Sequence, residues 1–563
     1  MAEPAREQIF RDAGGAGIGR AAPGVIGVVG AGTMGAGIAQ LAARAGARVL
    51  LQDPLADALE RGLERVRKGL SKDLESGRID GEQERAARER LEGAAELQAL
   101  EPCELVIEAA PERLELKHEL YGQLSQIVSE ECVLATNTSS LPVTAIAAAA
   151  SHPERVVGMH FFNPAPLMRL LEVVAGEQSG EPALAIADAT GEAMGKTVIR
   201  ASDGPGFLVN RCNRPFGLEA LRLLGERIAD VETIDRICRM EGGFPMGPFE
   251  LMDLVGVDTG LEISKSFYAQ SFGEPRWRPS PITARYVAAG RFGRKSGRGY
   301  YSYEGDRGSH RPPDPEPLSA EPPGHGEGVV VIAGPGVLAD ELRAAAQGAG
   351  YEVRAPQDPT GGVLPALILE CDPAPGEEAG EAARRERHAA AHQGGARLLL
   401  CQTGSLGALD PGGSAVGFCV LGPLAQVGLV ELTRSESSSP LAAARAERFF
   451  GALGKHVVWV GDAPGLVLGR IVCQVINEAS FALGEGVGEA TDIDTGMVLG
   501  LSHPRGPLRW ADEIGLDRVL AVLEGLCEEY REERYRPAPL LRSHVQAGRL
   551  GRASGAGFFD YES

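Results

Sequence analysis

The stretch VIGVVGAGTMG, residues 25–35, decides the fold expected for the first part of this chain. An apolar run gives way to a glycine-rich turn, after which apolar residues recur at helical spacing. Further apolar runs at 49–53, 105–108 and 133–136 alternate with helical stretches. Because alternating strands and helices favour parallel pairing, the sequence predicts a doubly wound α/β domain with helices on both faces of its sheet.

The glycines of the turn fit a dinucleotide-binding fingerprint. In that motif the first glycine permits the tight turn, the second lets the backbone approach a pyrophosphate, and the third lets helix and strand pack closely. Here they are Gly30, Gly32 and Gly35, while Thr33 and Met34 open the helix whose N-terminus would attract the phosphates. The alternative is a glycine-rich turn that binds nothing.

Asp53 closes the next predicted strand, 21 residues after Gly32. Its carboxylate would accept hydrogen bonds from a ribose diol and repel a 2′-phosphate, which favours NAD over NADP.

Composition excludes several classes of protein. The 563 residues carry a formal net charge of −21, which argues against a nucleic-acid partner. We find no apolar run long enough for a membrane span, so no membrane partner is expected. The nine cysteines lack paired metal-type spacing, which predicts no metal site and a reducing, cytoplasmic setting. Residues 1–23 lack the apolar core of a signal peptide and are expected to form a flexible tail.

The second half of the chain repeats the first. GK and DGPGFLVNR within residues 195–211 return as GK and DAPGLVLGR within 454–470. Four pairs of identical residues hold a constant spacing of 259: Arg211 and Arg470, Asp235 and Asp494, Pro248 and Pro507, Asp253 and Asp512. We therefore expect an α/β domain at 24–205, a helical domain at 206–305, a linker at 306–327, a second α/β domain at 328–461 and a second helical domain at 462–563. The first two domains are called the first half below, and the last two the second half.

Polar residues that could carry chemistry follow the predicted strands of the first half. The run Asn137-Thr138-Ser139-Ser140 follows one strand, and His160 to Pro164 follows another, with Glu172 twelve residues after His160. A histidine is a natural general base near neutral pH, and a carboxylate on its other nitrogen would fix its tautomer. A structural histidine that only satisfies loop backbone is the alternative.

The second half discriminates between these interpretations, because a loop that needs a side chain for folding should keep it in both copies. By alignment on Pro164 and Pro423, the changes are His160 to Cys419, Asn163 to Gly422, Ser139 to Gly404 and Asn210 to Gly469, whereas Glu172 is retained as Glu431. The third glycine of the turn becomes Ala339. We therefore expect the second copy to be degenerate and to bind no dinucleotide. We also expect Glu172 to have a structural role in addition to a functional one.

Residues 24–303 resemble the 3-hydroxyacyl-CoA dehydrogenase family. The resemblance is carried by the glycine turn, LVIEAAPE at 105–112, NTSS at 137–140, HFFNP at 160–164, PGFLVNR at 205–211 and GFPMGP at 243–248. It implies an NAD-binding Rossmann-type domain, a helical domain and an acyl-CoA thioester as substrate. The duplicated tail, with EERYRP at 532–537, is similar to a bacterial subgroup acting on 3-hydroxyadipyl-CoA in phenylacetate degradation.

The resemblance also implies roles for individual residues. His160 would take the proton of the 3-hydroxyl, Glu172 would orient His160, and Ser139 and Asn210 would hydrogen-bond the reacting oxygen or the nicotinamide. Four further residues match NAD-contacting positions of the family: Glu112, Lys117, Asn163 and Lys295. The acyl chain, 3-hydroxybutyryl or 3-hydroxyadipyl, stays open at this stage.

The sequence gives a weaker indication of where coenzyme A would bind. A basic cluster on the helix after Asp53, formed by Arg61, Arg65, Arg67, Lys68 and Lys72, suits phosphates, and a solvated helix face is the equal alternative. The repeat further suggests an internal pseudo-dimer in which two related helical domains bury faces that a shorter relative would bury by dimerising.

The sequence features favour the dehydrogenase over three other functions. A short-acid β-hydroxyacid dehydrogenase would use a catalytic lysine, and a non-catalytic NAD-responsive protein would show no turnover. A fused enoyl-CoA hydratase is not expected, because about two dozen residues precede the first strand.

Overall fold

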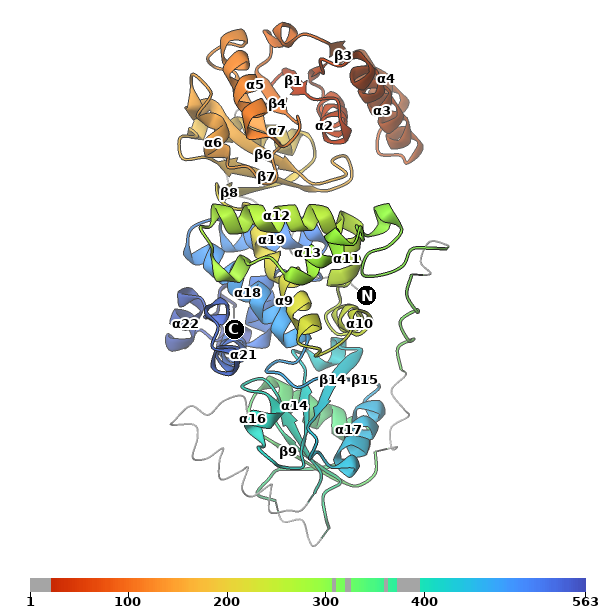
Figure 1. Ribbon diagram of the computed structural model, residues 1–563. Coiled ribbons are helices and arrows are strands. Elements are labelled where there is room, and N and C mark those ends of the chain that lie inside the picture. Colours follow the sequence, from red (N-terminus) through yellow and green to blue (C-terminus); the bar gives the residue numbers. More distant parts are fainter. Residues whose placement is uncertain (1–21, 306–309, 319–325, 359–362, 372–394, 563) are drawn as a thin grey trace. The chain divides into compact units, whose positions relative to one another are not determined.

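The computed structural model describes residues 22–305, 310–318, 326–358, 363–371 and 395–562 (Figure 1). Most of the predicted tail and part of the predicted linker therefore lie outside the described residues. The chain divides into two compact units, the first formed by Met1–Arg211 with Glu485–Ser502 and the second by Cys212–Gly484 with His503–Ser563. The first unit thus contains a segment of the second half, and the second unit contains a segment of the first.

The first unit is built on an eight-stranded sheet in the order β3-β2-β1-β4-β5-β6-β7-β8, in which all neighbours are parallel except β6 and β7. Its strands are β1 Val25–Val29, β2 Arg48–Gln52, β3 Leu91–Ala94, β4 Leu105–Glu108, β5 Val133–Thr136, β6 Val156–Phe161, β7 Leu170–Ala175 and β8 Thr197–Ser202. The strands predicted at 105–108 and 133–136 are confirmed as β4 and β5, and that predicted at 49–53 is β2.

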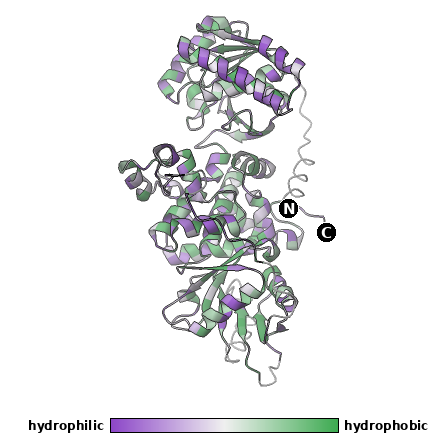
Figure 2. Ribbon diagram, turned by 90° about the vertical axis from the view of Figure 1, so that its right-hand side faces the viewer, coloured by the Kyte–Doolittle hydropathy of each residue, from purple (hydrophilic) through white to green (hydrophobic). Residues whose placement is uncertain are grey.

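Helices cover this sheet and bury an apolar core that includes Val28, Leu51 and Ile107. They are α2 Thr33–Arg44, α3 Ala56–Glu75, α4 Gly81–Glu89, α5 Leu114–Ile127, α6 Val143–Ala147 and α7 Glu181–Ala193, with α8 Val209–Cys212 at the end of the segment and α19 Ala490–Leu501 from the second half. Figure 2 shows hydrophobic strands beneath helices whose outer turns are hydrophilic. This partition follows the apolar periodicity of the sequence.

The second unit contains a seven-stranded sheet in the order β10-β9-β11-β12-β13-β14-β15, in which only β13 and β14 pair antiparallel. Its strands are β9 Val329–Ala333, β10 Glu352–Arg354, β11 Leu367–Glu370, β12 Arg397–Leu400, β13 Val416–Cys419, β14 Leu429–Arg434 and β15 His456–Val460. The longer helices of the unit are α9 Arg214–Gly225, α10 Val231–Met240, α11 Pro248–Val255, α12 Val257–Gln270, α13 Pro281–Ala288, α14 Val337–Gly348, α17 Pro440–Ala452, α18 Leu468–Gly484, α20 Pro507–Ile514, α21 Leu516–Tyr530 and α22 Pro539–Gln546.

Strand pairing aligns the two sheets and corrects one equivalence drawn from the sequence. Thr136 pairs with Gly158 in the first sheet, and Leu399 pairs with Gly417 in the second. Because Gly158 and Gly417 have the 259-residue spacing, Thr136 corresponds to Leu399, and Ser139 therefore corresponds to Gln402. The alignment of Ser139 with Gly404 was therefore wrong by two residues. Loops tolerate insertions and deletions, so an alignment made across a loop from sequence alone can shift by a few positions.

One contact is made twice, once in each unit. In the first unit, the Ser202 amide at the end of β8 donates to the carbonyl oxygen of Val487, just before α19, at 2.8 Å. In the second unit, the Gly461 amide after β15 donates to the carbonyl oxygen of Ile228, just before α10, at 2.7 Å. The two donors are 259 residues apart, as are the two acceptors. Each sheet is therefore bordered by a helix that comes from the other half of the chain.

A buried ion pair joins α18 to α9 in the second unit. Arg470 and Glu219 are both inaccessible to solvent, and their charged groups lie 2.6 Å apart. Glu226, Tyr530 and Tyr535 complete the hydrogen bonding of the guanidinium. Burial alone would raise the pKa of Glu219, but the neighbouring guanidinium groups, Arg470 first, lower it to about 2. The pair is therefore charged and fully satisfied.

We predict that Arg470→Ala lowers the free energy of unfolding by about 3 kcal/mol, because Glu219 would lose one of its two counter-charges and keep only Arg222, which lies 2.7 Å from its other oxygen. Urea denaturation checks this, with Lys265→Ala as the control. Lys265 pairs with Glu262 at the surface, where both side chains are more than half exposed, so its removal should cost at most about 1 kcal/mol. Equal losses from both variants would contradict the prediction.

Candidate active site

A histidine and a glutamate face each other on the two antiparallel strands of the first sheet. His160 on β6 pairs directly with Glu172 on β7, and its Nδ1 lies 2.5 Å from Glu172 Oε2. Both side chains are buried, with 6% and 0% of their surface exposed. Because an ionised carboxylate only accepts hydrogen bonds, Nδ1 carries the proton and Nε2 keeps a lone pair for an incoming proton.

The second oxygen of Glu172 is bound by the backbone that follows β8. Oε1 accepts hydrogen bonds from the amides of Leu208 and Val209 at 3.2 and 2.9 Å. The carboxylate therefore connects the sheet to the start of α8 as well as orienting the imidazole. This link is the structural role expected for Glu172 from its retention in both halves.

Two aromatic rings flank the histidine. The ring of Phe162 lies 4.7 Å from that of His160 between centroids, and the ring of Phe207 lies 5.7 Å away. Both phenylalanines are buried, so the imidazole of His160 lies in apolar surroundings.

The glycine turn after β1 has the geometry that a dinucleotide requires. Gly30 has φ of +95°, and a Cβ there would meet the carbonyl oxygen of Ala109 at 2.8 Å. A Cβ on Gly35 would lie 1.8 Å from the Gly30 carbonyl oxygen, so helix and strand touch at this point. A Cβ on Gly32 would meet nothing, which leaves open space at the N-terminus of α2. Thr33 and Met34 form the first turn of α2 there, and no side chain caps it.

Asp53 follows β2 beside this turn. Its Oδ2 accepts a hydrogen bond from the Ala31 amide at 2.9 Å, and its Oδ1 accepts one from the Leu55 amide at 3.0 Å. Each oxygen keeps a lone pair, so the carboxylate can still accept from a ribose diol. The turn, the free helix N-terminus and this acid together fit NAD.

Glu112 organises the loop that carries Ser139. Its Oε1 accepts hydrogen bonds from the Ser139 and Ser140 amides and from the Thr138 hydroxyl, at 2.7–3.0 Å. Burial would raise the pKa of Glu112, but the Lys117 ammonium and these hydrogen bonds lower it below its ordinary value. Ser139 itself is exposed at the surface of the loop.

Lys117 lies beneath this loop rather than at the surface. Its side chain is 1% exposed, and Nζ lies 2.7 Å from Glu108 Oε1 and 3.5 Å from Glu112 Oε2. The ammonium thus holds the two carboxylates in place from below.

The remaining predicted residues lie at separate positions. Asn163 is exposed in the loop after β6, and Asn210 lies on α8 directly after Val209. Lys295 belongs to the second unit, where its ammonium pairs with Asp258 at 2.6 Å.

Sequence reasoning missed Lys196. Its buried Nζ donates to the carbonyl oxygens of Ala165 and Met168, both at 2.6 Å, and so fixes the loop after β6. Burial lowers its pKa to about 8. The second half repeats the arrangement, with Lys455 donating to Val427, and this repetition was the available signal.

The second sheet has the same framework without the base. Cys419 pairs with Glu431 across β13 and β14, and Glu431 accepts hydrogen bonds from the Val467 and Leu468 amides at 2.7 and 2.8 Å. Glu241, the residue after α10, lies close to Glu431. Burial and then the charge of Glu431 raise the pKa of Glu241 well above its ordinary value, and burial raises the pKa of Glu431 to about 7. Burial of both carboxyl groups therefore favours their protonated forms.

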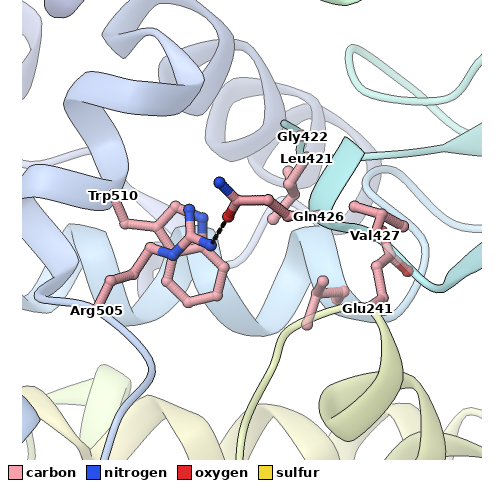
Figure 3. A pocket seen from close by; sticks show the side chains of 8 residues that line it. Glu241, Leu421, Gly422, Gln426, Val427, Arg505 and Trp510 are labelled. Atoms are coloured by element: carbon pink, nitrogen blue, oxygen red, sulfur yellow. Dashed lines mark hydrogen bonds between the residues drawn. The ribbon is translucent and has the colours of Figure 1, made fainter. Parts of the chain in front are cut away.

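Glu241 also borders a small cavity in the second unit (Figure 3). The other lining residues are Leu421, Gly422, Gln426, Val427, Leu468, Arg505 and Trp510. Figure 3 shows Arg505 turned toward Gln426, to which it donates at 2.8 Å, so that the guanidinium lies over the indole of Trp510. These contacts occupy the guanidinium of Arg505 within the second unit.

The second glycine turn lacks the features that favour a dinucleotide. Strand pairing places Gln357 where the first sheet has Asp53, since Val25 pairs with Arg48 and Val329 with Glu352. The guanidinium of Arg343 donates to the carbonyl oxygen of Gly334 at 2.6 Å and so covers the turn.

The residues that the structure describes contain neither a candidate metal site nor a helix that could span a membrane. Within those ranges we find no cluster of histidine, cysteine, aspartate or glutamate suited to a metal ion. In the same ranges, no helix combines the length and the apolar character needed to cross a membrane.

Comparison with known proteins gives a consistent result. Residues 25–204 match the family model described as 3-hydroxyacyl-CoA dehydrogenase, NAD binding domain. Residues 206–303 and 465–561 both match the model of the C-terminal domain of the same family. The chain is 36% identical to the 3-hydroxyadipyl-CoA dehydrogenase of Escherichia coli over 521 residues, which cover 92% of this chain and 97% of that protein. It is 42% identical over 277 residues to a probable 3-hydroxybutyryl-CoA dehydrogenase of Deinococcus radiodurans, covering 49% of this chain and 99% of that protein.

A solved structure matches along nearly the whole chain. The crystal structure of 3-hydroxybutyryl-CoA dehydrogenase from Escherichia coli K12 aligns with a TM-score of 0.75 and 33% identity, covering 93% of this chain and 98% of that one.

The carboxyl pair predicts a pH effect on stability. Because the folded state raises the pKa of Glu431 to about 7 and that of Glu241 further, both above the ordinary value of 4.5, folding binds a proton. The stabilisation is therefore complete below pH 4.5 and is lost as pH rises through about 7. Glu241→Gln replaces a buried group that titrates with a neutral amide, so the unfolding free energy should fall less between pH 5 and pH 8 than in the wild type.

Urea denaturation at several pH values measures this slope. Glu436→Gln, which changes an exposed carboxylate, is the control and should follow the wild type. A Glu241→Gln slope that matches the wild type would show that the pair is not coupled to folding.

Proposed function

Because the chain belongs to the 3-hydroxyacyl-CoA dehydrogenase family, we propose that its first half carries out the NAD-dependent oxidation of (S)-3-hydroxyacyl-CoA to 3-oxoacyl-CoA at His160. The observation that carries the assignment of the base is the buried His160–Glu172 hydrogen bond, with Nε2 left to accept. The second sheet supports it by contrast, since the same strand positions there hold Cys419 and Glu431.

In this reaction His160 Nε2 accepts the proton of the 3-hydroxyl while the hydride leaves C3. Bound NAD supplies the acceptor for that hydride. The Glu172 carboxylate stabilises the imidazolium that forms, and its two backbone hydrogen bonds keep it from rotating away. Ser139 and Asn210 would hydrogen-bond the reacting oxygen or the nicotinamide.

The proposed NAD site uses the glycine turn and the residues around it. The turn comprises Gly30, Gly32 and Gly35 with Thr33 and Met34, and Asp53 would accept the hydroxyls of the ribose. Lys117, ion-paired to Glu108 and close to Glu112, would act by fixing Glu112 and its loop. Asn163 and Lys295 are proposed as further contacts.

The acyl group is proposed from the relatives. The relative that matches 92% of this chain is named for 3-hydroxyadipyl-CoA, whereas the one from Deinococcus radiodurans, named for 3-hydroxybutyryl-CoA, matches the first half. We propose 3-hydroxyadipyl-CoA as the preferred substrate, in phenylacetate degradation, with 3-hydroxybutyryl-CoA, as in fatty-acid metabolism, as the competing candidate. The exposed basic residues of α3, among them Arg61, Arg67 and Lys72, are available for coenzyme A phosphates.

We further propose that the second half is a degenerate tandem copy of the first, with the domain limits given above. The shared strand order, the 259-residue spacing and the two matches to one C-terminal family model support this. The reciprocal contacts of α10 and α19 support an internal pseudo-dimer, with the whole chain a monomer or a homo-oligomer. A cytoplasmic location fits the nine free cysteines.

Replacing the base should abolish most turnover. We expect His160→Ala to lower kcat by about 10²–10⁴-fold while NAD binding is kept, because the base acts in the chemical step. The measurement is NADH formation from NAD with (S)-3-hydroxybutyryl-CoA and with 3-hydroxyadipyl-CoA, side by side. His152→Ala removes an exposed histidine and should leave kcat unchanged. Full activity of His160→Ala would refute the assignment, and no turnover by the wild type with either thioester would favour an NAD-binding protein without catalysis.

Asp53 should set the choice of cofactor. We expect Asp53→Ala to raise the KM for NAD by about 10- to 100-fold, since hydrogen bonds to a charged acceptor contribute about 1.5–3 kcal/mol. The relative rate with NADP should rise, because the repulsion of its 2′-phosphate is removed. Initial rates with both cofactors test this, with Asp57→Ala on the first turn of α3 as the control. An unchanged ratio of the two rates would exclude this role.

A further inference from the structure

Helix α19 comes from the second half of the chain and yet borders the catalytic sheet of the first. Its Asp492 carboxylate accepts a hydrogen bond from the Arg200 amide on β8 at 3.2 Å, in addition to the Ser202–Val487 contact described above. The strand next to β8 is β7, which carries Glu172. The helix is therefore anchored on the strands that support the catalytic pair.

Glycines on one face of α19 bring its backbone directly against residues of the site. A Cβ at Gly496 would lie 2.7 Å from the side chain of Val209. A Cβ at Gly500, one turn further, would lie 2.8 Å from Leu170 Cδ2 and 3.2 Å from Phe162 Cε1. The ring of Phe162 is thus packed between this helix and the imidazole of His160, whose centroid is 4.7 Å away.

The other sheet provides an internal comparison. The residues 259 positions before Gly496 and Gly500 are Ile237 and Glu241, on the face of α10 that borders the second sheet. There Glu241 lies against Glu431, beside the cysteine that replaces the base. The half that keeps the histidine therefore has glycine at this position of the adjoining helix, and the half that has lost it has a large side chain.

We propose that Gly500 is a positioning residue for the catalytic base, acting through Phe162. The bare backbone of α19 lets the Phe162 ring occupy the place from which it supports the His160 imidazole in its contact with Glu172. On this view the second half, although it lacks a base of its own, contributes a required part of the first half's site. The inference rests on the proposed function for its kinetic readout.

The test is a double-mutant cycle of Gly500→Ala and Phe162→Leu. In the wild-type background, Gly500→Ala should lower kcat by about 10- to 100-fold, because the added methyl displaces Phe162 toward His160. The KM for NAD should change less than about twofold, since the glycine turn is untouched. In the Phe162→Leu background the smaller side chain leaves room for the methyl, and Leu170 Cδ2, the end of a flexible side chain, can move aside, so Gly500→Ala should cost less than about twofold. Gly451→Ala is the matched control, because a Cβ on that helical glycine of α17 meets nothing.

A second readout does not depend on turnover. The proton of the short His160–Glu172 hydrogen bond should give a far-downfield proton NMR signal that is absent in His160→Ala. Gly500→Ala should shift this signal and Gly451→Ala should not. An unshifted signal, or the same loss of kcat with and without Phe162→Leu, would overturn the proposal. If the wild type shows no turnover but the signal shifts as expected, the proposed function fails and the positioning role stands.

Discussion

A buried carboxylate has to be surrounded by hydrogen-bond donors, and in the first sheet this requirement joins the structure to the chemistry. Glu172 has no exposed surface, and its oxygens bind the His160 imidazole on one side and the Leu208 and Val209 amides on the other. The backbone hydrogen bonds fix the carboxylate, and the fixed carboxylate holds the imidazole in one tautomer. The base is therefore preorganised by the way strand β7 meets helix α8.

The second sheet shows how the same kind of carboxylate is held where a cysteine takes the place of the histidine. Glu431 keeps both backbone hydrogen bonds, and Lys455 keeps its contact with the loop after β13. Cys419 stands where the first sheet has His160, and the raised pKa of the neighbouring Glu241 favours a neutral carboxyl group beside Glu431. A polar group under a sheet thus stays satisfied after its partner changes, because leaving it unpaired would cost more than substituting the partner.

Much of the fold and part of the candidate site could be predicted from the sequence. Apolar runs located β2, β4 and β5, and the spacing of Gly30, Gly32 and Gly35 indicated a turn in which two of the three positions have no room for a Cβ. The burial of Lys117 could not be predicted, because its partner Glu108 lies on a strand. An ion pair between a helix and a strand leaves no local pattern in the sequence. The sequence also could not predict that α10 and α19 each border the sheet of the other half. The periodicity of a helix shows that it has a buried face, but it does not show which sheet covers that face.

The position of α19 also bears on how this chain avoids self-association. Strand β8 is the last in its sheet, and unpaired amides on such an outer strand invite pairing with another molecule. The Ser202 amide is instead occupied by Val487 from the far end of the sequence. A fragment cut after residue 305 would expose that edge, so the first half on its own would be prone to aggregate. The second half thus protects an edge that the first half alone would leave open to pairing.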